Sequence, residues 1–175
     1  MTLATERLVL REFALDDWRA MLAIHSQPEV VRWLMFDVMD EAGARAYVQR
    51  IIDGVRDQVV VELAVTLPGD DTLIGRTGFR RGEDPRIAEL WFTIGPAHQG
   101  KGYAVEAARA LLGYAFETLG LHRVWGDCDP RNPASAGVMK KLGMRSEGHL
   151  VQNVFIKGEW CDSLVFAMLA EEWFR

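Results

Sequence analysis

The stretch that decides the fold is GPAHQGKGYAVEAARALL, residues 95–112, in which three glycines lead directly into a helical pattern. A helix start offers several backbone N–H groups without intrahelical partners, and it carries a partial positive charge. Glycines just before it let the main chain approach a ligand without a Cβ in the way. The segment therefore predicts an anion-binding loop from Gln99 to Ala104, with the charge of Lys101 nearby. A simple tight turn remains the alternative.

The segments around this stretch predict an α/β domain with a mixed sheet. Strand patterns occur over residues 8–13, 61–67, 73–80, 87–94, 123–127, 151–156 and 163–169. Helical patterns occur over residues 18–25, 28–34, 40–52 (with Val55 following), 104–119 and 132–142. Asp16 or Asp17 is expected to cap the first helix, and Asp40 or Glu41 opens the third. Because a strand, a helix and a strand surround residues 104–119, the two flanking strands are expected to run parallel.

Length and composition indicate a soluble globular protein. A chain of 175 residues predicts one domain over residues 1–175. The net charge of −5 gives no support to nucleic-acid binding. The N-terminal residues do not read as a signal peptide, and no apolar run reaches membrane-spanning length, so a cytoplasmic location is expected. Neither the two cysteines nor the four histidines show a metal-binding spacing, so no metal is expected.

Two nucleotide-binding motifs each fail on one residue of the glycine segment. A P-loop, GxxxxGK[ST], fits from Gly95 to Lys101, but Gly102 stands where Ser or Thr would bind magnesium. A dinucleotide fingerprint, GxGxxG, fits at Gly100 and Gly102, but Val105 occupies its third glycine position. Neither motif accounts for the antiparallel strands that precede the segment.

The segment QGKGYA, residues 99–104, matches the Q/R-x-x-G-x-G/A pattern of the GNAT N-acetyltransferases. Four stretches, in order, resemble the branch of that family that includes the RimJ/RimL ribosomal-protein N-terminal acetyltransferases: TERLVLREF, AELWFTIGPAHQGKGYAVEA, NPASAGVMKKLGM and KGEWCDSLVFAML. The resemblance covers about residues 5–170. It implies a single-domain acyl-CoA N-acyltransferase fold with a central, mostly antiparallel, splayed sheet flanked by helices.

The resemblance implies acetyl-CoA as the cofactor and names the residues that would hold it. Its pyrophosphate would meet the amides of Gln99, Gly100, Lys101, Gly102, Tyr103 and Ala104. Its pantetheine arm would run beside Phe92, Thr93 and Ile94, with Asn132 and Ser135 also in contact. Asn132 is in addition the expected cap of the following helix. For Lys140, Lys141 and Arg131, a solvated surface charge is favoured over a role in binding coenzyme A phosphates.

Acetyl transfer to an amine needs a neutral amine, a stabilised oxyanion and a proton for the departing thiolate. Glu89 is the candidate base, with a carboxylate on the solvent face of the strand or in a salt bridge with Arg76 or Arg80 as the alternative. The Ile94 amide is the candidate oxyanion donor. Many family members carry a tyrosine where this chain has Met139, which leaves Ser135 or water as the proton donor. Packing of its hydroxyl in the helix is the alternative for Ser135.

The acceptor is expected to be a primary amine, either a protein N-terminus or a small molecule such as a polyamine, an antibiotic or an amino acid. Aromatic residues that could border its channel are Trp33, Phe36, Trp91 and Trp160, together with Met35 and His98. Cys128 is expected to be a core residue, so transfer is direct rather than through a covalent enzyme intermediate. A non-catalytic acyl-CoA-binding module of the same fold is the competing hypothesis. A homodimer paired through the final hairpin is possible from the sequence.

Overall fold

The computed structural model describes residues 1–54 and 59–175, so Val55 lies outside the described residues. The strands are β1 (Thr2–Ala4), β2 (Val9–Arg11), β3 (Val60–Leu67), β4 (Asp70–Arg81), β5 (Ile87–Ile94), β6 (Arg123–Cys128), β7 (Arg145–Ile156) and β8 (Glu159–Leu169). The helices are α1 (Trp18–His25), α2 (Pro28–Val31), α3 (Glu41–Gly54), α4 (Tyr103–Gly113), α5 (Pro133–Leu142) and α6 (Ala170–Trp173). Short 3-10 or π turns lie at Leu15–Asp17, Pro96–His98 and Tyr114–Thr118.

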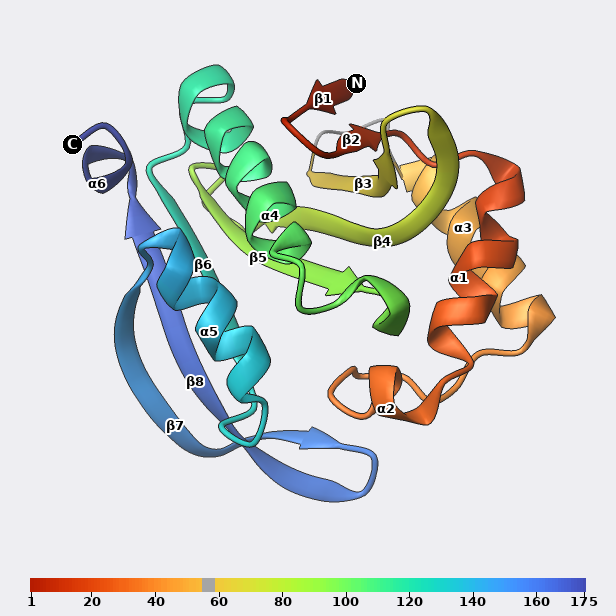
Figure 1. Cartoon of the computed structure of the whole chain (residues 1–175). Helices are drawn as coiled ribbons and strands as arrows, with labels where there is room; N and C mark the ends of the chain where they lie inside the picture. Colours follow the sequence, from red (N-terminus) through yellow and green to blue (C-terminus); the bar gives the residue numbers. More distant parts are fainter. Residues whose placement is uncertain (55–58) are drawn as a thin grey trace.

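One 8-stranded sheet organises the chain, in the order β1-β2-β3-β4-β5-β6-β8-β7 (Figure 1). Neighbouring strands are antiparallel except β5 and β6, which run parallel across the α4 connection. This confirms the expected mixed, mostly antiparallel sheet. Helices α4 and α5 lie in front of the sheet in Figure 1, and α1 and α3 pack together at the other end of it.

Two hydrophobic clusters cover the sheet. The stripe along α4 buries Ala107, Ala108, Leu111 and Leu112 in the larger cluster, against residues of β3 to β6. The second cluster joins α1 and α3 to β3 and β4. Since helices cover both faces near its centre, β3 is buried from Val61 to Thr66 even though polar and apolar residues alternate along it.

Several element boundaries differ from the sequence expectation. Helix α2 ends at Val31 rather than Leu34, and the hairpin strands start earlier than expected, at Arg145 and Glu159. Asp17 does not cap α1; its carboxylate accepts bonds from the Ala14 amide and from the Arg11 guanidinium.

Other local expectations are confirmed. Asp40 accepts a bond from the Gly43 amide at 2.7 Å at the start of α3. Gly143 ends α5 and Gly120 follows α4 and its π turn, both with positive φ. Among the described residues, none of the helices has the length and hydropathy that a membrane crossing requires.

Candidate active site

Strands β5 and β6 separate in the middle of the sheet. Their pairing covers only Ile87–Glu89 against Arg123–Trp125, and from there the strands diverge (Figure 1). The rest of β5, from Leu90 to Ile94, therefore has one edge without a strand partner. The sheet is splayed here, as the sequence led us to expect.

The register with β4 shows which backbone groups of β5 face that gap. The Gly95 amide donates to the Ile74 carbonyl at 2.8 Å, so Gly95 is bonded to β4. Antiparallel pairs alternate between bonded and non-bonded, and Ile94 opposite Gly75 is therefore a non-bonded pair. The N–H and C=O groups of Ile94, and by the same alternation those of Phe92, point away from β4. Both N–H groups and the Phe92 C=O therefore face the gap, while the Ile94 C=O accepts a bond from the Gln99 side chain.

The glycine segment forms a tight loop between β5 and α4. Gly100 and Gly102 have φ of 74° and 82°, a left-handed conformation that glycine adopts without the steric cost of a Cβ. The side-chain amide of Gln99 donates from Nε2 to the Ile94 carbonyl at 2.8 Å, which ties the loop back to the end of β5. Because Gly102 is the N-terminal cap of α4, the free amides of that helix lie at the loop.

A cavity of about 560 Å³ joins the loop, the end of β5 and the start of α5. It brings together most of the residues singled out from the sequence: Trp33, Phe92, Thr93, Ile94, Gln99, Gly100, Gly102, Tyr103, Ala104, Asn132 and Ser135. His98 lines it too. A loop with two positive-φ glycines at a helix start, opening into this cavity, fits a phosphate-bearing ligand.

Ser135 is oriented by the cap of α5. The Asn132 side chain accepts a bond from the Ser135 amide at 3.2 Å, so Asn132 is the cap that the sequence predicted. The Asn132 Nδ2 group also donates to Ser135 Oγ at 3.1 Å. Because Oγ accepts this bond, its own hydrogen is free to be donated elsewhere. Ser135 thus offers a proton-donating hydroxyl at the wall of the cavity.

Met139 has no proton to give, and Cys128 is a poor nucleophile. Met139 is 1% exposed and packs in the core over Gly126 of β6. Burial raises the pKa of the Cys128 thiol to about 11, with the charges of Asp127 and Asp129 adding to the effect. That thiol stays protonated at neutral pH and is a poor nucleophile.

Glu89 does not line the cavity. It extends from β5 beside Arg80 of β4, and the Arg80 guanidinium donates to Glu89 Oε2 at 2.9 Å. The Glu89 side chain is 32% exposed. Arg76, the other salt-bridge partner considered, is instead paired with Glu62 at 2.6 Å in the core.

The predicted acceptor residues are dispersed. Of the candidates, Trp33 and His98 line the cavity, and the guanidinium groups of Arg32 and Arg131 lie 4.6 and 5.6 Å from the Trp33 ring. Phe36 packs against the His25 and Tyr47 rings. Trp91 lies over Gly78 of β4. Trp160 is 60% exposed and makes an edge-to-face contact with Phe155 in the final hairpin.

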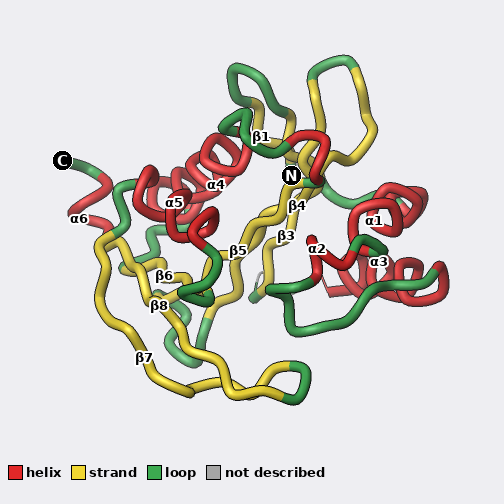
Figure 2. The backbone as a smooth tube through the Cα atoms, turned by 60° about the horizontal axis from the view of Figure 1, so that its bottom comes forward, coloured by secondary structure: helices red, strands yellow, loops and turns green. Residues whose placement is uncertain are grey.

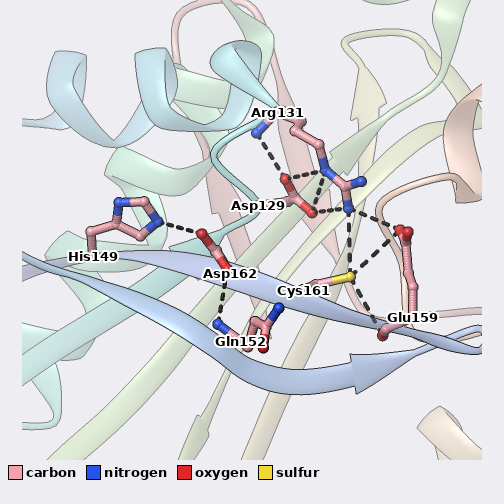
Figure 3. A network of polar contacts seen from close by, with 7 residues as sticks. All are labelled: Asp129, Arg131, His149, Gln152, Glu159, Cys161 and Asp162. Carbon is pink, nitrogen blue, oxygen red and sulfur yellow. Dashed lines mark hydrogen bonds and ion pairs between the residues drawn. The ribbon is translucent and has the colours of Figure 1, made fainter.

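Arg131 belongs to a polar network and is not a free surface charge (Figure 3). Its guanidinium pairs with Asp129 at 2.6 Å and with Glu159 at 3.0 Å, and it contacts Cys161 Sγ at 3.5 Å. The hydrogen bonds from Arg131 keep the pKa of Asp129 below its usual value. This network ties the loop before α5 to the hairpin strand β8.

The tip of that hairpin reaches the α2 side of the molecule. Lys157 Nζ donates to the Val31 carbonyl at 2.7 Å, and Figure 2 shows the tip of the β7–β8 hairpin on the side of α2. Helix α2 flanks the cavity, whereas none of the hairpin residues lines it. Glu29, Val30 and Leu34 line the cavity from α2 and the residues after it, and no sequence motif points to them. Gly137, Val138 and Lys141 also line it, and their helical spacing from Ala134 could have identified them.

Lys101 is part of the glycine loop, but it does not line the cavity. Its ammonium donates to the Ala97 carbonyl at 3.0 Å. A larger cavity of about 960 Å³ lies on the other side of α4, between the N-terminal segment and α6. It lacks the β5 edge and the α5 cap, so we assign the chemistry to the smaller cavity. In residues 1–54 and 59–175, no three His, Cys, Asp or Glu side chains gather as a metal ion would need.

The comparisons with known proteins all point to the same family. Residues 7–145 match the family model described as acetyltransferase (GNAT) domain. The uncharacterized N-acetyltransferase YnaD of Bacillus subtilis is 36% identical over 173 residues, 99% of either chain. A GNAT-family acetyltransferase from Bacillus anthracis has a solved structure with a TM-score of 0.90 and 32% identity, covering 98% of this chain and 100% of that one. The ribosomal protein uS5-alanine N-acetyltransferase of Escherichia coli is 32% identical over 84 residues, 48% of this chain and 43% of that one.

Proposed function

The chain belongs to the GNAT acetyltransferase family and is an N-acetyltransferase that uses acetyl-CoA, and we propose that it passes the acetyl group directly to a primary amine on the α2 side of the cavity. Bound acetyl-CoA supplies an activated acetyl thioester. The observation that carries the proposal is the meeting, in one cavity, of the glycine loop, the open edge of β5 and the hydroxyl of Ser135.

Each of these parts has a separate task. The amides of the loop and of the first turn of α4 hold the phosphates, since they combine free donors with the positive end of a helix. The backbone of Phe92 pairs with the amide groups of the pantetheine arm. The Ile94 N–H, directed into the gap between β5 and β6, stabilises the negative charge that develops on the thioester oxygen.

Ser135 passes a proton to the departing thiolate and takes one back from solvent water, so that its hydroxyl is restored. Its hydroxyl hydrogen is not used in the bond with Asn132. Met139, which replaces the tyrosine of many family members, is buried in the core and has no proton to give.

Glu89 is the base that we propose, acting through water because it lies outside the cavity wall and pairs with Arg80. A base so placed suits an amine that deprotonates easily. At pH 7 deprotonation of an α-amine with a pKa near 8 costs about 1 kcal/mol, whereas deprotonation of a lysine side chain costs about 4–5 kcal/mol. The α-amine of a protein N-terminus, as in the RimJ/RimL branch, is therefore favoured, and a small-molecule amine is the alternative.

We further propose that residues 1–175 form a single domain that works in the cytoplasm. Both cysteines are free thiols, as expected in a reducing compartment. Strand β7 is the last strand of the sheet, and its exposed Leu150 and Val151 favour a homodimer paired through this hairpin.

The test is release of free thiol from acetyl-CoA in the presence of a panel of amines. The panel contains a peptide with a free N-terminal alanine, the same peptide with a blocked N-terminus and one lysine, free amino acids and spermidine. We expect the fastest release with the free N-terminal peptide. Binding of coenzyme A without thiol release on any amine would contradict the proposal and support the non-catalytic module.

A further inference from the structure

The N-terminal turn from Thr5 to Leu8 is bound to the first turns of α4, about a hundred residues later in the chain. The Thr5 hydroxyl donates to Glu106 Oε1 at 2.6 Å, and the Arg7 amide donates to the same oxygen at 2.8 Å. The Leu8 amide donates in turn to the Thr5 hydroxyl at 3.0 Å, which closes the turn. The Glu106 carboxylate is therefore the anchor of this segment.

The Arg7 guanidinium contacts three parts of the glycine loop and of α4. Its Nε donates to Glu106 Oε2 at 2.7 Å, and its Nη1 donates to the Lys101 carbonyl at 3.0 Å. Its Cζ lies 5.1 Å from the centre of the Tyr103 ring. The planar guanidinium can hold a carboxylate and a carbonyl together because its donors point in fixed, different directions.

The bond to the Lys101 carbonyl fixes the direction of the next amide. In a trans peptide the C=O of one residue and the N–H of the next point in opposite directions, so the Gly102 N–H points away from Arg7. Gly102 lines both cavities, whereas Arg7 lines only the larger one. The Gly102 amide is thus directed toward the side on which the smaller cavity lies.

From this geometry we propose that Arg7, held by Glu106, is a positioning residue for the phosphate loop, which keeps the Gly102 amide aimed at the bound phosphates. This rests on the proposed function, since it requires phosphates at the loop. Arg7 acts through the backbone and does not itself touch the ligand. This role of Arg7 accounts for the contact between the turn from Thr5 to Leu8 and a loop about a hundred residues later in the chain.

Isothermal calorimetry with coenzyme A tests this without any acceptor amine. We expect Arg7→Ala to raise the dissociation constant about tenfold, equivalent to about 1.4 kcal/mol. Glu106→Gln is expected to weaken binding several-fold, because the guanidinium loses its anchor. In turnover assays the KM for acetyl-CoA rises while kcat at saturating acetyl-CoA changes less than about twofold, since the reacting groups are untouched.

Arg145→Ala is the matched control. Arg145 has a side chain 45% exposed, against 47% for Arg7, and it also joins segments distant in sequence, through its ion pair with Glu172 of α6. We expect it to lower the melting temperature about as much as Arg7→Ala and to leave coenzyme A binding unchanged. Equal binding by the Arg7→Ala and Arg145→Ala variants would overturn the inference.

Arg7→Lys separates positioning from charge. The lysine ammonium keeps the positive charge but lacks the planar fork that reaches Glu106 and the Lys101 carbonyl together. We expect it to bind coenzyme A nearly as weakly as Arg7→Ala. Full restoration of affinity by Arg7→Lys would show that charge alone matters and would refute the positioning role. If the wild-type protein itself binds no coenzyme A, the proposed function fails, which is a different outcome.

Discussion

Replacement of Gly102 by alanine tests the phosphate loop directly. Gly102 has φ of 82°, and a left-handed conformation costs an alanine about 1–2 kcal/mol. A Cβ at this position would lie 3.4 Å from Arg7 Nη2, an ordinary contact, so the backbone strain is the main effect. The loop relieves that strain by rotating toward negative φ, and this rotation turns the neighbouring amides away from the cavity.

The expected magnitudes differ for stability and for binding. The free energy of unfolding falls by about 1 kcal/mol, measured by urea titration. Loss of one amide bond to a charged phosphate weakens coenzyme A binding by about 1.5–3 kcal/mol, or about 10- to 150-fold in the dissociation constant. Isothermal calorimetry measures the second quantity.

Gly120→Ala is the control for strain alone. Gly120 has φ of 64°, and a Cβ there would meet nothing within 4 Å. It follows the helix at the end opposite to the loop and lines neither cavity. We expect the same loss of stability as for Gly102→Ala and unchanged binding of coenzyme A. If the two variants bind coenzyme A as tightly as the wild type, the loop does not hold the phosphates and our account of the site is wrong.

Three further changes test the other parts of the site and the core. Ser135→Ala should lower kcat by about 100-fold, because the thiolate loses its proton donor; an unchanged rate in single-turnover measurements would exclude this role. Glu89→Gln should also lower kcat/KM by about 100-fold; an unchanged kcat/KM would show that Glu89 is not the base. Burial, together with the charge of Arg76, lowers the pKa of His25 from 6.5 to about 4. Between these pH values the unfolded chain binds a proton that the folded chain does not, so the free energy of unfolding falls by up to about 3 kcal/mol as the pH drops from 6.5 to 4. Urea titrations across this range should show that slope in the wild type and a smaller slope in His25→Leu; equal slopes would point to another group.

The sequence alone determined the parts of this protein that depend on neighbouring residues. The glycines at 100 and 102 predicted a tight loop at the start of a helix, and the structure gives both of them positive φ. Alternating and helical spacing located β5 over Ile87–Ile94 without error, and Asn132 was recognisable as a helix cap. The order of the four sequence stretches was enough to indicate the family.

Tertiary structure decided which residues share the site. Whether Glu89 faces the cavity or Arg80 depends on the register of β5 against β4, and whether Trp33 lines the cavity depends on the docking of α2. Trp160 and Phe36 had the right chemistry for an acceptor channel but pack against aromatic neighbours elsewhere. The support of the phosphate loop by Arg7 joins residues far apart in the chain. Such contacts depend on how whole helices and strands pack around a common core, and the local spacing of residues in the sequence does not predict that packing.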